Sequence, residues 1–133
     1  MVNITPEIKQ RFETSVVALG TVSQDNVPNV VAVACCKVVS DSQVLITDNF
    51  FNKTRVNLNA NQYVSLSFWN PVDGDNNWGY QFKGTAEVFT EGKWRDMVNN
   101  DPDNIGLAHK AAILVTITGI WDLANPKLIS SQI

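Results

Sequence analysis

Most of the chain alternates between short apolar runs and short polar turns, which is the pattern of β-strands joined in hairpins. Residues 63–69 show strict alternation, with Val64, Leu66 and Phe68 on one face. Residues 30–39 are almost wholly apolar and predict a strand buried on both faces. The pattern predicts six strands, at residues 15–21, 30–39, 44–47, 63–69, 78–88 and 113–121.

Helix signals occur at three places between these strands. Thr5 can cap a helix that carries Pro6 at its first position. A second helix is predicted to begin after Asn52, whose side-chain oxygen can accept a hydrogen bond from a free backbone N–H group. Thr90 can cap a third helix, which ends before Pro102.

This order of elements predicts a mainly β fold with two or three short helices, in a single domain spanning residues 1–133. Strands joined by short turns favour a closed or nearly closed six-stranded antiparallel barrel, because closure removes exposed strand edges. Gly84 interrupts the strand at residues 78–88 and predicts a β-bulge. Residues 70–77 are polar and contain proline and glycine, so they predict a mobile surface loop.

The overall charge narrows the range of partners. A net charge of −3 and a pI near 4.9 argue against a nucleic-acid or anionic-membrane surface, which needs a basic face. No apolar stretch has the length of a signal peptide or of a membrane span. We therefore expect a cytoplasmic protein that binds neither nucleic acid nor membrane.

The two cysteines and the one histidine give no recognisable catalytic or metal site. Cys35 and Cys36 are adjacent in a predicted strand, so their side chains should point to opposite faces and not form a disulfide. Their spacing does not make a zinc site, and a role as small core residues is favoured over a redox role. His109 precedes a strand, where an exposed or capping role is favoured over a catalytic one.

The most informative stretch is the start of the second predicted helix. Lys53 and Arg55 are two cations in a first helical turn, where they oppose the helix dipole. That local cost is explained if a phosphate binds there, because free N–H groups, the Thr54 hydroxyl and both cations would converge on it. The alternative is that both cations simply point into water. No glycine-rich phosphate loop occurs in the chain.

Three short motifs together resemble the FMN-binding split-barrel family, which includes pyridoxamine 5′-phosphate oxidases and small bacterial FMN-binding proteins. They are Ile46-Thr47, Asn52-Lys53-Thr54 and Phe82-Lys83-Gly84-Thr85-Ala86, in an order and spacing that cover residues 12–121. The resemblance implies a homodimer of six-stranded split barrels with two FMN molecules at the subunit interface.

The resemblance also implies roles for particular residues. Lys53 and Thr54 would bind the FMN phosphate, while Asn52 stands where the oxidases often carry an arginine. Ile46 and Thr47 would lie along the isoalloxazine ring, and Trp78 or Gln81 would approach the flavin. The strand near the phosphate and ribityl chain would supply Val33, Ala34, Cys35, Cys36 and Lys37.

Two functions follow as expectations. The first is a small oxidoreductase or electron carrier that uses bound FMN with a small-molecule or protein redox partner. The second is a module that binds flavin or another phosphate-bearing ligand without turnover. Oxidation of pyridoxamine phosphate itself is disfavoured, because the family's arginine-bearing terminal segment is missing: no arginine follows Arg95.

Overall fold

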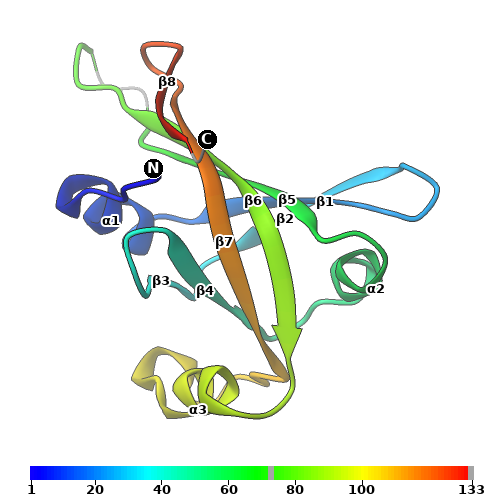
Figure 1. The fold of residues 1–133 in the computed structure, drawn as a ribbon. Helices are drawn as coiled ribbons and strands as arrows, with labels where there is room; N and C mark the ends of the chain where they lie inside the picture. Colours follow the sequence, from blue (N-terminus) through cyan, green and yellow to red (C-terminus); the bar gives the residue numbers. More distant parts are fainter. Residues whose placement is uncertain (72–73, 132–133) are drawn as a thin grey trace.

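The computed structural model describes residues 1–71 and 74–131, and it shows a curled antiparallel sheet with three α-helices around it (Figure 1). The helices are α1 (Pro6–Glu13), α2 (Lys53–Ala60) and α3 (Lys93–Asn100), with a short 3-10 helix η1 (Pro102–Asn104). The strands are β1 (Val17–Val22), β2 (Pro28–Val33), β3 (Cys36–Val38), β4 (Gln43–Asp48), β5 (Tyr63–Trp69), β6 (Gly79–Phe89), β7 (Ala111–Asp122) and β8 (Lys127–Ser131).

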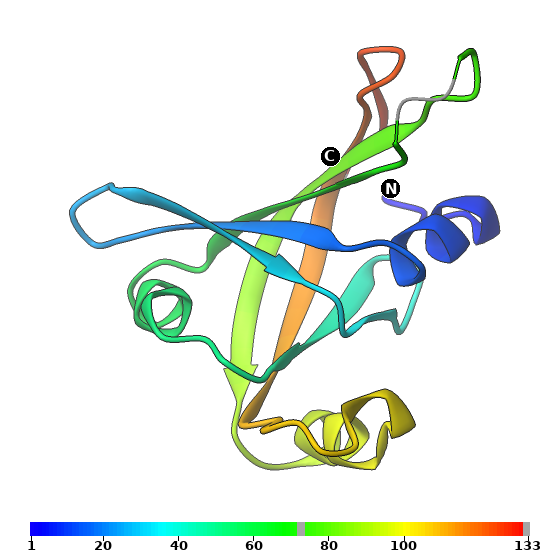
Figure 2. The same cartoon turned by 180° about the vertical axis from the view of Figure 1, so that it is seen from behind.

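All the strands belong to one sheet, whose order is β2-β1-β5-β6-β7-β4-β3, with β8 paired to β7. Every pairing is antiparallel. Figure 2 shows from behind that the sheet curls instead of lying flat. The mainly β split-barrel prediction is therefore confirmed.

The predicted number of six strands is wrong, since the described residues form eight. The apolar run at residues 30–39 divides into β2, which pairs with β1, and β3, which pairs with β4. Ala34 and Cys35 lie between them, where the chain leaves one neighbour for the other. The second addition, β8, folds back on β7 after a tight turn at residues 123–126.

Aromatic side chains form the centre of the core. Phe12 from α1 packs against Phe68 of β5 and Phe82 of β6, with ring centroids 5.2 and 5.5 Å away. All three are fully buried. As predicted, Thr5 caps α1, and its hydroxyl accepts a hydrogen bond from the Ile8 N–H group at 3.3 Å. The helix thus closes one end of the barrel with a single apolar face.

Gly84 lies at the irregularity predicted from the sequence, because the register between β6 and β7 shifts between Lys83 and Gly84. A Cβ atom at Gly84 would overlap the carbonyl oxygen of Thr116 on the neighbouring strand. Only glycine lets the two backbones approach this closely.

The third helix begins later than predicted. Its N-cap is Gly92, at φ +88°, and not Thr90. It ends before Pro102, as predicted. Val98 of this helix is buried with Leu45 of β4 in a second apolar cluster, between the sheet and α3.

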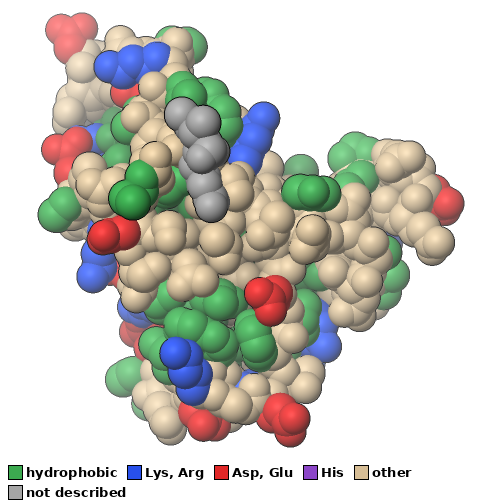
Figure 3. Space-filling view, in the orientation of Figure 1, with side chains coloured by type: hydrophobic (Ala, Val, Ile, Leu, Met, Phe, Trp, Pro, Cys, Tyr) green, Lys and Arg blue, Asp and Glu red, His purple; other side chains and the backbone are tan. Residues whose placement is uncertain are grey.

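Hydrophobic side chains also reach the surface, between the sheet and α3 and on the protruding β1–β2 hairpin (Figure 3). The loop predicted at residues 70–77 includes residues 72–73, which lie outside the described residues. Within the described ranges, no helix combines the length and apolar content needed to cross a bilayer.

Candidate functional site

A hollow of about 630 Å³ opens between β2, the end of β4 and the first turn of α2, and we call it the α2 pocket. Its size lies within the range of roughly 300–1,000 Å³ that is common for small-molecule sites. Residues from β2 and the following loops make its apolar wall, and the start of α2 makes its polar end. Seven residues predicted from the sequence line it: Val33, Ala34, Cys35, Thr47, Asn52, Lys53 and Thr54.

The polar end has the features of an anion site. Lys53 is the first residue of α2, and it forms no ion pair with any described residue. Thr54 is buried, and its hydroxyl oxygen accepts a hydrogen bond from Asn29 Nδ2 at 3.3 Å. Because this oxygen acts as an acceptor there, the hydroxyl proton is left to bond elsewhere. Free N–H groups of a first helical turn add to this positive end.

Two predictions about this helix start are wrong. Asn52 is the N-cap residue, but its side chain makes no capping hydrogen bond. Arg55 does not converge on the α2 pocket with Lys53, because its Nη1 binds the carboxylate of Asp48 at 2.6 Å. Because Arg55 is paired with the buried Asp48 carboxylate, Lys53 and not Arg55 lines the pocket.

Asp48, which the sequence analysis did not single out, shapes the turn between β4 and α2. Its carboxylate is fully buried and accepts a hydrogen bond from the Phe51 N–H group at 3.0 Å. Lys110 Nζ donates to the Phe51 carbonyl at 3.0 Å and lies 3.8 Å from the same carboxylate. Aspartate commonly binds the backbone a few residues on in such turns, so the Asp-Asn pair was the available signal.

Three of the predicted site residues lie outside the α2 pocket on β3 and β4. Ile46 and Cys36 face each other across the two strands and belong to the main core. Lys37 binds Asp103 at 2.8 Å on the surface. That hydrogen bond raises the pKa of the Lys37 ammonium.

The last two predicted site residues lie elsewhere in the same chain. Trp78 lines a second groove of about 790 Å³, on the other side of β2, together with Trp69. Gln81 lies on β6, opposite Trp121 of β7. Within one chain, neither residue lines the α2 pocket.

Cys35 lines the pocket, whereas its neighbour Cys36 is buried in the core. Burial raises the pKa of the Cys35 thiol, and the nearby Asp101 and Asp103 carboxylates raise it further. The thiol therefore stays protonated near neutral pH, which makes it a poor nucleophile.

Asn49 joins the pocket to the segment that precedes β7. Its Nδ2 lies 3.9 Å from Cys35 Sγ, and its Oδ1 accepts a hydrogen bond from the His109 N–H group at 2.7 Å. His109 is partly buried and has a positive φ of 31°. Its ring Nδ1 lies 2.7 Å from Asn99 Oδ1. The histidine thus holds a loop in place, and it does not line the pocket.

Comparison with known proteins shows which family the chain resembles. A family model described as pyridoxamine 5′-phosphate oxidase matches residues 4–124. The chain belongs to this family. An uncharacterized protein of Methanocaldococcus jannaschii is 37% identical over 132 residues, which are 94% of this chain and 84% of that protein.

Solved structures show the same fold for members of different description. HupZ of Group A Streptococcus has a TM-score of 0.85 at 24% identity, over 96% of this chain and 99% of that one. An FMN-binding protein of Syntrophomonas wolfei has a TM-score of 0.72 at 13% identity, over 89% and 82%. HutZ, a heme storage protein of Vibrio cholerae, has a TM-score of 0.67 at 18% identity, over 90% and 94%.

Proposed function

We propose that this protein is a cytoplasmic FMN-binding flavoprotein that works as a small oxidoreductase or electron carrier. The observation that carries the proposal is the α2 pocket, in which an apolar wall leads to a helix start whose lysine, Lys53, forms no ion pair with any described residue. A flavin mononucleotide has the matching shape, because its flat ring is largely apolar and its phosphate is anionic.

The residues present fit the two ends of FMN. Lys53 and the first turn of α2 would hold the phosphate, and the Thr54 hydroxyl would donate to it. The small side chains of Val33 and Ala34 leave room for a ring to lie against the strand. Lys53 is exposed and has no ion-pair partner among the described residues, so its ammonium group is available to a bound anion.

Bound FMN would supply the electron or hydride transfer chemistry, while the protein binds, orients and shields it. The residues of this chain show which tasks remain for the protein. Asp48 and Lys110 fix the turn that positions Lys53. Cys35 keeps its proton and adds an uncharged side chain to the wall of the pocket.

We further propose that the protein acts as a homodimer with FMN at the subunit interface, as the family resemblance implies. The groove behind β2 supports this arrangement, since Val16, Val30 and Trp69 line it and expose more than half of their surface. This groove and the α2 pocket lie next to each other at β2, because Val31 and Ala32 of this strand line both.

The second candidate is a binding module with the same pocket and no turnover. The likeness to a heme storage protein favours testing it, although that likeness concerns the fold. The lining of the α2 pocket includes no histidine that could bind heme iron, and it does include a lysine for a phosphate. The pocket chemistry therefore favours FMN as the ligand.

A titration of the purified protein with FMN, riboflavin and hemin tests the proposal. FMN should bind far more tightly than riboflavin, because riboflavin lacks the phosphate that Lys53 would hold. Equal affinities for the two flavins would remove the phosphate assignment, and preferential binding of hemin would support the storage alternative. Anaerobic reduction of the FMN complex by NADH or NADPH would then separate a reductase from a passive binder.

A further inference from the structure

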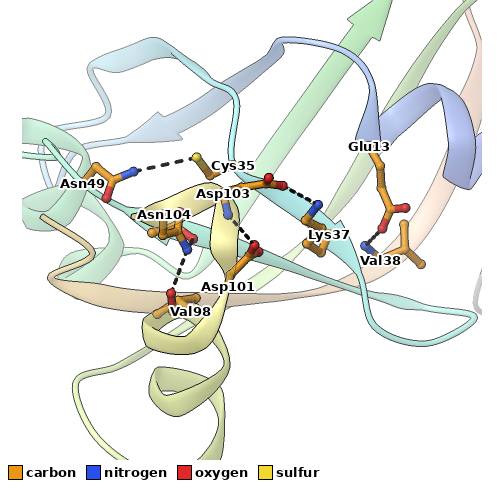
Figure 4. A network of polar contacts seen from close by, with 10 residues as sticks. Glu13, Cys35, Lys37, Val38, Asn49, Val98, Asp101, Asp103 and Asn104 are labelled. Atoms are coloured by element: carbon orange, nitrogen blue, oxygen red, sulfur yellow. Dashed lines mark hydrogen bonds and ion pairs between the residues drawn. The ribbon is translucent and has the colours of Figure 1, made fainter. Parts of the chain in front are cut away.

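Thr47 and Asn104 form a buried pair at the back of the α2 pocket. Thr47 is the next-to-last residue of β4 and lines the pocket, and Asn104 closes η1 behind it. Asn104 Nδ2 donates to Thr47 Oγ1 at 3.0 Å and to the Val98 carbonyl at 2.8 Å. Figure 4 shows the Asn104 side chain next to Val98, with a dashed line for the bond to the Val98 carbonyl.

The bond to Val98 fixes the orientation of the Asn104 amide. A backbone carbonyl can only accept, so the amide atom that faces it must be the NH₂ group. The same NH₂ group faces Thr47, and the threonine oxygen must therefore be an acceptor in this contact. The hydroxyl proton of Thr47 cannot point back at Asn104.

The Thr47 proton is left without an acceptor among the described residues. The other amide atom, Asn104 Oδ1, is buried and also has no partner there. Both groups have less than 10% of their residue surface exposed, and unpaired buried polar groups are unusual away from functional sites. Since Thr47 lines the pocket, a ligand in the pocket can supply the missing acceptor.

We infer that Asn104 is a positioning residue that makes Thr47 a fixed hydrogen-bond donor to a ring acceptor of the bound flavin. This inference rests on the proposed FMN function and adds a residue that neither the motifs nor the pocket lining contains. Asn104 reaches the ligand only through Thr47.

A fixed donor has a different effect on the two redox states. A hydrogen bond to an acceptor that becomes more negative on reduction is stronger in the reduced state, because charge-assisted hydrogen bonds are the stronger ones. Thr47 should therefore favour reduced over oxidised FMN and raise the midpoint potential. Lys53, at the phosphate, should bind both states equally.

The test measures the midpoint potential of bound FMN in variants at both positions. Thr47→Val keeps the shape of the side chain and removes the donor, so reduced FMN should bind about tenfold more weakly relative to oxidised FMN. For a two-electron couple, tenfold corresponds to a fall of about 30 mV. Thr47→Ser keeps a hydroxyl and should stay close to the wild-type potential.

Asn104→Ala should lower the potential in the same direction, by less than Thr47→Val, because the hydroxyl becomes free to turn. The double variant should show no larger shift than Thr47→Val alone, since Asn104 acts through Thr47. If Asn104→Ala does not fold, Asn104→Ser replaces it: a serine can still bond near Val98 but is too short to span both contacts.

Several results would overturn the inference. An unchanged midpoint potential in Thr47→Val would show that Thr47 does not donate a hydrogen bond to the flavin. Equal shifts in Thr47→Val and Thr47→Ser would show that loss of the hydroxyl does not cause the change in potential. Fully additive shifts would show that Asn104 does not act through Thr47. Failure of the wild-type protein to bind FMN overturns the proposed function and this inference together, whereas binding with an unchanged Thr47→Val potential overturns only the inference.

Discussion

Lys53 and Thr54 make the proposed phosphate site testable at the level of single side chains. Their combined replacement by alanine should weaken FMN binding by about 2–4 kcal/mol, taking roughly 1.5–3 kcal/mol for each hydrogen bond to a charged group and allowing for non-additivity. Isothermal titration or flavin fluorescence measures the loss. Both side chains line the pocket and neither belongs to the main hydrophobic core, so the double variant should still fold.

The matched control for this double variant is Lys9→Ala, because Lys9 is an exposed lysine on α1, away from the pocket. It should leave the FMN affinity unchanged. Riboflavin provides a second control, since its affinity should fall little in the double variant. An equal loss for riboflavin and FMN would show that the variant damages the pocket as a whole.

Cys36 gives a prediction about alkaline stability. Burial raises the pKa of its thiol well above the ordinary value of 9.0. At pH above 9 the unfolded chain loses this proton while the folded protein keeps it, so the free energy of unfolding must fall as pH rises. Between pH 8 and pH 10 this residue should cost about 1.4 kcal/mol of stability.

Urea unfolding of the wild type and of Cys36→Ala at both pH values measures this cost. The wild type is expected to lose about 1.4 kcal/mol more than Cys36→Ala between pH 8 and pH 10. Cys35→Ala serves as the control, because Cys35 is partly exposed and should show a smaller dependence. Parallel pH profiles for the wild type and Cys36→Ala would contradict the assignment of the buried neutral thiol.

At the level of the elements, the bulge at Gly84 links β6 to β7. Gly84→Ala should destabilise the protein by about 1–3 kcal/mol, because the new Cβ atom meets a backbone carbonyl that cannot move without shifting the strand. Gly20→Ala is the control, since a Cβ there lies 3.6 Å from its nearest neighbour, an ordinary contact. Thermal or urea unfolding compares the two, and equal stabilities would mean that the strands adjust freely.

The elements also show which parts of the fold a local pattern can predict. The alternation at residues 63–69 and the proline and threonine at the start of α1 depend on neighbouring residues, and both predictions are confirmed. The division of residues 30–39 into β2 and β3 depends on which distant strand each half pairs with. An uninterrupted apolar run contains no signal for that change of partner.

The start of α2 shows the same limit for the site. Two cations in one helical turn look equivalent in the sequence, yet Arg55 pairs with Asp48 while Lys53 stays at the pocket. The difference arises from a buried carboxylate at the end of the preceding strand. A buried carboxylate without a partner costs free energy, so a nearby arginine forms an ion pair with it.

At the level of the whole molecule, the pocket brings together residues from β2, the end of β4, α2 and the segment before β7. The sequence motifs predicted the β2, β4 and α2 contributions through the family resemblance. Asn49 and Leu107, which line the pocket from loops, and Asn104, which lies behind the pocket at the end of η1, were missed. Loop residues of this kind carry no periodic pattern.

The dimer is a property of the whole molecule and provides the final prediction. Val30→Glu places a charge on the exposed face of β2, in the groove proposed to meet a second copy, where burial of an unpaired charge would oppose association. The wild type should sediment as a dimer of 14.7 kDa chains, and Val30→Glu as a monomer with FMN affinity reduced at least tenfold. Ile105→Glu is the control, because Ile105 is equally apolar and even more exposed but lies outside the groove. A wild-type monomer that binds FMN fully would place the cofactor within one chain, and a dimeric Val30→Glu would move the interface to another face.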